Sequence, residues 1–135
     1  MKRVAIALFG LIPVLVLTSA PVPAQGEKVE IKQIMAKVNK PEGLYFAVAK
    51  ELKAEDTNWD DVKKDTKEIA RLGALVGKND PPKGEKDSWQ TLTKAYTENT
   101  KALETAAAKM DKQAAQAASE KIGTSCTVCH KAHRK

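Results

Sequence analysis

The spacing of apolar residues beyond position 27 is the feature that most limits what this chain can fold into. Ile31, Ile34, Met35 and Val38 follow one another at intervals of three and four residues, which places them on one face of an α-helix. Four further stretches have helical spacing: Leu44, Tyr45, Val48 and Leu52; Val62, Ile69, Leu72 and Val76; Trp89, Leu92, Tyr96, Leu103 and Ala107; Ala115, Ala118, Ile122, Cys126 and Cys129. Because few β-branched alternations typical of strands are present, the sequence predicts an all-α protein.

Proline and capping residues divide these stretches into helices. Pro41 interrupts the first stretch, and we expect one helix kinked there in preference to two short ones. Asp56, Thr57 and Asn58 offer capping oxygens ahead of Trp59, so a second helix is predicted to begin there.

A loop and a brief break separate the remaining helices. The segment from Lys78 to Lys86 contains two prolines and a glycine, which indicates a loop. Asp87 or Ser88 is the expected cap of the third helix, and Asp111 is the expected start of the fourth. Four helices with short connections pack most simply as an antiparallel up-down four-helix bundle.

The N-terminus has the pattern of an export signal. An apolar run over residues 4–17 follows Lys2 and Arg3 and precedes small residues that end at Ala24. We predict a cleaved signal peptide over residues 1–24 and a bacterial periplasmic location. The alternative is an uncleaved membrane anchor, but the run is shorter than the roughly 20 residues that a spanning helix needs.

Cleavage leaves residues 25–135 as one domain without a stable membrane insertion. This domain carries 21 basic and 17 acidic side chains, a net charge of +4, and its lysines are scattered among acidic residues. A scattered charge of this size disfavours nucleic-acid binding. Only five aromatic residues remain to fill a core, which leaves space for a large apolar cofactor.

Both cysteines of the chain lie in the motif Cys126-Thr-Val-Cys129-His130. On a helix, residues i, i+3 and i+4 share one face, so two thiols and an imidazole are expected to point together into the bundle. Two thiols can add to the two vinyl groups of a porphyrin, and the adjacent imidazole can bind its iron. The motif therefore predicts one covalent haem c held by two thioethers.

Three other uses of the motif are less well supported. A dithiol oxidoreductase carries its cysteine pair at the head of a helix after a strand, whereas this pair ends the last predicted helix. A structural zinc site needs four ligands, and the fourth candidate, His133, lies one turn along the same helix. A surface disulfide between the two cysteines is the third alternative.

Over residues 27–134 the sequence resembles the class II c-type cytochromes, which include cytochromes c′ and their low-spin relatives. The resemblance rests on a helical bundle of this length with the haem motif at its C-terminal end. It also rests on Arg134, which follows His130 by four residues as in the family's usual ending. The family usually has an aromatic residue where this chain has His133.

The second axial ligand of the iron determines the function. In an up-down bundle, the first half of the first helix lies beside the C-terminal half of the fourth, so Met35 can reach the iron opposite His130. Met110 lies 20 residues before His130, about 30 Å along a helix, which is too far. The run 34–37 also resembles the low-spin subgroup, in which methionine is the distal ligand. High-spin relatives tend to have an arginine where this chain has Ile31.

Three other residues have expected roles or positions of their own. The resemblance implies that Arg134 pairs with a haem propionate, although Arg134 can also complement the helix C-terminus. Trp89 is expected in the core, where it can contact the haem. His133 cannot reach the opposite haem face, and we expect a partly exposed position at the end of the helix.

These features together predict an exported electron carrier with a single His/Met-ligated haem. No distal acid–base pair is apparent, so the chain is not expected to be an enzyme. The alternative is a cytochrome c′-like protein with an open iron position that binds small gas molecules. The expected partners are redox proteins, with mild steering toward acidic surfaces. Pairing into a homodimer through the first two helices is a further possibility from the resemblance.

Overall fold

A computed structural model describes Gly26 and residues 28–135; the predicted signal peptide, residues 1–24, lies outside this part of the chain. Its helices are α1 (Ile31–Asn39), α2 (Leu44–Glu51), α3 (Trp59–Val76), α4 (Lys86–Ala108) and α5 (Lys112–His133). None of these helices is both long and apolar enough to cross a membrane.

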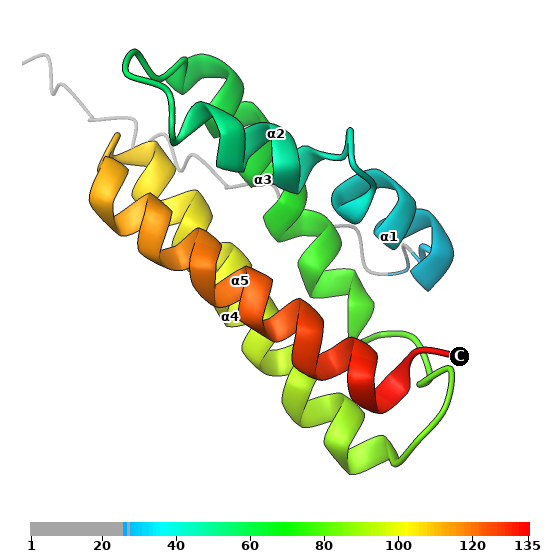
Figure 1. The fold of residues 1–135 in the computed structure, drawn as a ribbon. Coiled ribbons are helices and arrows are strands. Elements are labelled where there is room, and N and C mark those ends of the chain that lie inside the picture. Colours follow the sequence, from blue (N-terminus) through cyan, green and yellow to red (C-terminus); the bar gives the residue numbers. More distant parts are fainter. Residues whose placement is uncertain (1–25, 27) are drawn as a thin grey trace, which may run out of the picture.

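The helices form an up-down bundle, as predicted. Figure 1 shows α1 and α2 running one after the other along α3, with α4 and α5 as an antiparallel pair beside them. Helix α3 packs against α1, α2 and α4, whereas α5 packs mainly against α4 and also touches α2. The four-helix architecture is therefore confirmed, with its first helix divided into α1 and α2.

The division of the first helix corrects the expectation of a single kinked helix. Lys40 ends α1 with φ −70° and ψ 159°, an extended conformation that residues before proline prefer. The chain then turns tightly, and the Gly43 N–H donates to the Lys40 carbonyl at 2.7 Å. A Cβ atom on Gly43 would lie 2.6 Å from the Val38 carbonyl oxygen, so this turn requires glycine. Pro41 thus separates two helices.

Capping side chains explain two of the helix starts. The Asn58 side chain accepts from the Asp61 N–H at 3.3 Å, and the Asp111 side chain accepts from the Ala114 N–H at 3.0 Å. The predicted cap of α4 was wrong. That helix begins at Lys86, one residue before Asp87, and its N-cap residue makes no side-chain capping bond.

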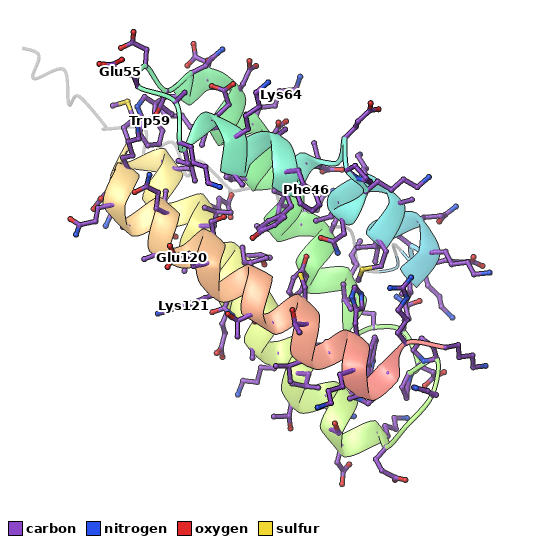
Figure 2. All side chains as sticks on the ribbon, in the orientation of Figure 1. Phe46, Glu55, Trp59, Lys64, Glu120 and Lys121 are labelled. Atoms are coloured by element: carbon purple, nitrogen blue, oxygen red, sulfur yellow. The ribbon has the colours of Figure 1, made fainter. Side chains whose placement is uncertain are left out.

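The apolar stripes seen in the sequence meet in one core. The buried apolar residues are Ile34, Val38, Val48, Leu52, Val62, Ile69, Leu72, Leu75, Val76, Trp89, Tyr96, Leu103, Ala106, Ala107, Ala115, Ala118 and Ile122. Charged side chains cover the outside of the bundle, with Lys64, Glu55, Glu120 and Lys121 among them (Figure 2). The small residues concentrate where α4 meets α5, which lets these two helices approach closely.

Candidate haem site

The cysteine motif lies in the last turns of α5 and faces a pocket. Cys126, Cys129 and His130 are each partly buried, and all three line the same pocket. Both cysteines are free thiols. Their spacing along one helix face explains why they converge, as the sequence predicted.

The other walls of this pocket come from α1, α3 and α4. Met35 and Asn39 on α1 line it, together with Val76, Thr93 and Tyr96. Among the described residues, no Cα atom of α1 comes within 8 Å of a Cα atom of α5. The pocket therefore lies where the bundle's first and last helices stand apart, and it brings Met35 and His130 to one cavity.

The electrostatic state of the thiols disfavours redox catalysis by the cysteine pair itself. Burial raises the pKa of the Cys126 thiol, with the neighbouring Cys129 as a smaller cause, and burial also raises the pKa of Cys129. A dithiol oxidoreductase instead needs a lowered pKa, which a helix N-terminus supplies. These thiols lie near a helix C-terminus, so they are protonated at neutral pH.

His130 is held in the form that can bind a metal ion. Burial lowers the pKa of the His130 imidazole, and the charge of Arg134 lowers it further. A neutral imidazole has a nitrogen lone pair available for a metal ion. The position of His130 beside the two thiols therefore suits an axial ligand of an attached porphyrin.

His133 does not have the expected partly exposed position. It is buried, and its Nδ1 lies 2.7 Å from the Lys83 carbonyl oxygen while its Nε2 lies 3.1 Å from the Ser88 hydroxyl. A carbonyl only accepts, so Nδ1 carries the proton. Because both ring nitrogens are engaged, His133 is not available as the fourth ligand of a zinc site. The sequence missed this position because Lys83 and Ser88 are distant along the chain.

Trp89 and Arg134 are not among the residues that line the pocket. Trp89 is buried, donates from Nε1 to the Asn79 carbonyl at 2.7 Å, and meets the His133 ring edge-on with centroids 5.2 Å apart. His133 thus fills an aromatic position against Trp89. Arg134 is exposed and follows the last residue of α5. Contacts of Trp89 and Arg134 with a haem stay predictions.

Tyr96 and Asn39 are pocket residues that the sequence did not identify as functional. The Tyr96 hydroxyl is buried and has no hydrogen-bond partner, and burial raises its pKa. Leaving such a group unsatisfied costs about 1–3 kcal/mol, so a bound group that accepts its hydrogen bond would complete the site. An otherwise apolar pocket with two thiols, an imidazole and a thioether fits a covalently held haem.

Comparison with known families agrees with this donor set. Residues 84–134 match the family model described as Cytochrome C′. This part of the chain is similar to cytochrome C′. The matched region contains the end of the loop before α4, both helices of the α4–α5 pair and the complete cysteine motif. No curated protein and no solved structure gives a significant match to the chain.

The match supports haem binding through the cysteine motif, as in c-type cytochromes. The match begins at residue 84, so it does not include α1, on which Met35 lies. The match consequently supports the haem but does not distinguish a methionine-ligated iron from an open one. That distinction depends on the residues of α1.

Proposed function

We propose that this protein is an exported electron carrier with one haem c. Cys126 and Cys129 would hold the haem through two thioether links, and His130 and Met35 would bind its iron. The observation that carries the proposal is that Met35 and His130 line the same pocket from α1 and α5. The bound haem supplies a one-electron change between ferric and ferrous iron.

Each residue of the pocket has a separate part in this function. His130 offers a neutral imidazole because burial and Arg134 lower its pKa. Met35 offers a thioether, which favours ferrous iron over ferric iron. Val76 and Tyr96 contribute apolar wall, which limits the access of water. Two side-chain ligands leave no open position, so electrons would pass without binding of a substrate.

The other methionine of the described part of the chain is not a competitor. Met110 is 54% exposed and lies between α4 and α5, whereas the pocket is at the other end of α5. Met110 does not line the pocket. This supports Met35 as the thioether ligand and makes Met110 a useful control.

A second candidate function is binding of small gas molecules at an open iron position. The family match favours it, because the model is that of cytochrome C′ and its matched region leaves α1 out. In this alternative Met35 only fills space in the pocket. The two candidates therefore differ in whether the sulfur of Met35 is bound to iron.

Absorption spectra of the purified haem protein in both oxidation states test the proposal. The unmodified protein should be low-spin and bind carbon monoxide slowly or weakly, whereas Met35→Ala should be high-spin and bind it readily. Met35→Ala should also lower the reduction potential, because the preference of the thioether for ferrous iron is lost. Met110→Ala, which removes an exposed methionine, should leave all three properties unchanged.

Two outcomes of this experiment would contradict the electron-carrier proposal. One is an unmodified protein that is already high-spin and binds the gas readily. The other is a Met35→Ala variant whose spectrum does not change. Either result would favour the gas-binding alternative.

Attachment and location have tests of their own. The haem should remain with the polypeptide in denaturing electrophoresis, and the intact mass should equal residues 25–135 plus one haem. A mass without haem would contradict covalent attachment, and a mass that retains residues 1–24 would indicate an anchor. For partners we propose redox proteins, and the scattered lysines would provide mild electrostatic steering toward acidic surfaces.

A further inference from the structure

Asn39 contacts the sulfur atom of Met35. The Asn39 Nδ2 lies 3.0 Å from the Met35 Sδ, and both residues line the haem pocket. Asn39 is the last residue of α1 and follows Met35 by four positions, so one turn of this helix brings the two side chains together.

The chemistry of the two groups fixes the direction of this contact. A thioether sulfur has no proton and can only accept a hydrogen bond. The Asn39 amide must therefore present its N–H group, and not its oxygen, to Met35. The contact is partly buried, so water competes with it less than at an open surface.

A hydrogen bond to the sulfur restricts how Met35 can bind a metal ion. A thioether sulfur has two lone pairs, and a proton donor directed at one of them leaves the other for a metal. The bond also limits rotation of the Met35 side chain, which is long and flexible. Preorganising a ligand in this way reduces the cost of ordering it when the metal binds.

We propose that Asn39 is a positioning residue for the axial ligand. Its amide holds the Met35 thioether in one orientation, with a single sulfur lone pair directed into the pocket toward the iron. This inference rests on the proposed ligation by Met35. It adds a residue outside the cysteine motif and outside the matched region of the family.

The test is an Asn39→Leu variant of the haem-loaded protein, because leucine has nearly the same size but no N–H group. The S-methyl signal of Met35 should be a single proton resonance in the reduced unmodified protein. In Asn39→Leu it should shift or split, since either lone pair can then bind the iron. The affinity of the ferrous protein for carbon monoxide should rise about fivefold, the equivalent of one hydrogen bond.

A matched control removes a different asparagine amide. Asn99 on α4 donates to the Ser125 hydroxyl at 2.8 Å, and no hydrogen bond joins it to Met35. Asn99→Leu should leave the methyl resonance and the carbon monoxide affinity unchanged. Equal changes in Asn39→Leu and Asn99→Leu would mean a general loosening of the pocket and would overturn the specific role of Asn39.

The outcomes separate this inference from the function on which it rests. A low-spin unmodified protein whose Asn39→Leu variant has the same methyl resonance and gas affinity would overturn the role of Asn39 alone. A high-spin unmodified protein would overturn ligation by Met35 and the role of Asn39 with it. A shifted or doubled resonance in Asn39→Leu, with Asn99→Leu unchanged, would support both.

Discussion

The two halves of α5 meet the rest of the bundle in different ways. Near its start, α5 is tied to the α2 region by polar contacts: Gln116 donates to the Leu52 carbonyl at 2.7 Å, and the Tyr45 hydroxyl donates to the Ser119 carbonyl at 3.1 Å. Near its end, α5 faces α1 across the pocket, with no described Cα atoms of these helices within 8 Å of each other. The first half of α5 therefore contacts the α2 region directly, whereas a pocket separates its second half from α1.

The side chains at the two ends match this difference. Ala106 and Ala107 on α4 and Ala115 and Ala118 on α5 are buried near the turn between these helices, where small residues permit close packing. At the other end the inward residues of α5 carry sulfur and imidazole groups. The chain thus packs closely on itself where its side chains are small, whereas the end that carries the cysteine motif has a pocket between α1 and α5.

Loss of haem attachment should have the largest effect on the fold, and this effect should differ between the two ends of the bundle. A Cys126→Ala, Cys129→Ala double variant made without haem should be poorly helical, because the contacts between the haem and the pocket, which form only in the folded state, are lost. Circular dichroism should report the loss of helix, and hydrogen exchange should show α1 and the end of α5 losing protection before the α4–α5 turn.

A control within the same motif makes this prediction specific. Val128 lies between the two cysteines and is 49% exposed, so Val128→Ala should retain haem and helix content. Native-like circular dichroism and cooperative melting of the haem-free double variant would show that the end of the bundle with the pocket folds without haem. The comparison of the two ends would then be wrong.

An intermediate effect is expected at His133, which attaches the 77–85 loop to the haem end. His133→Ala should lower the free energy of unfolding by about 2 kcal/mol, because the Lys83 carbonyl and the Ser88 hydroxyl lose their partner. Denaturant unfolding of the haem-loaded protein measures this change. His133→Asn, which keeps an N–H group near the position of Nδ1, should restore part of the loss.

The loss of stability measured for the His133 variants shows what holds the 77–85 loop in place. A loss below about 0.5 kcal/mol, typical of exposed surface positions, would mean that the loop is held by packing of its other residues. Equal losses in His133→Ala and His133→Asn would show that the ring's contact with Trp89, and not its N–H group, holds the loop.

The smallest effect is expected at the well-packed end, at Met110. This residue has φ 56°, the one positive φ outside glycine among the described residues, and it occupies the position after the α4 cap where glycine is usual. Met110→Gly should relieve about 1–2 kcal/mol of backbone strain while adding about 0.4–1 kcal/mol of unfolded-state entropy. We expect thermal unfolding to show a net stabilisation of about 0.5–1 kcal/mol.

A matched substitution distinguishes strain from loss of the exposed side chain. Met110→Ala shortens the side chain but keeps the Cβ atom that makes a positive φ unfavourable. It should therefore not stabilise the protein. Equal stabilisation by alanine and glycine would mean that the methionine side chain itself is unfavourable at this turn.

Spacing and capping rules that use only neighbouring residues were sufficient to predict most of the helices and half of the site. The stripe from Val62 to Val76, the cap at Asn58 and the start of a helix near Asp111 depend on residues close in sequence, and the structure confirms them. The kink expected at Pro41 was wrong because Gly43 allows a tight turn, which periodicity does not report. Convergence of Cys126, Cys129 and His130 needed only the geometry of one helix.

What the sequence by itself determined is therefore the helical class, the helix faces and the donor set of the motif, since these follow from spacings of three and four residues. The tertiary structure alone decided the burial of His133, the orphaned hydroxyl of Tyr96 and the separation of α1 from α5. These depend on contacts between residues distant in sequence, whose geometry is set when helices pack. Periodicity identifies the face that turns inward, and packing determines what that face meets.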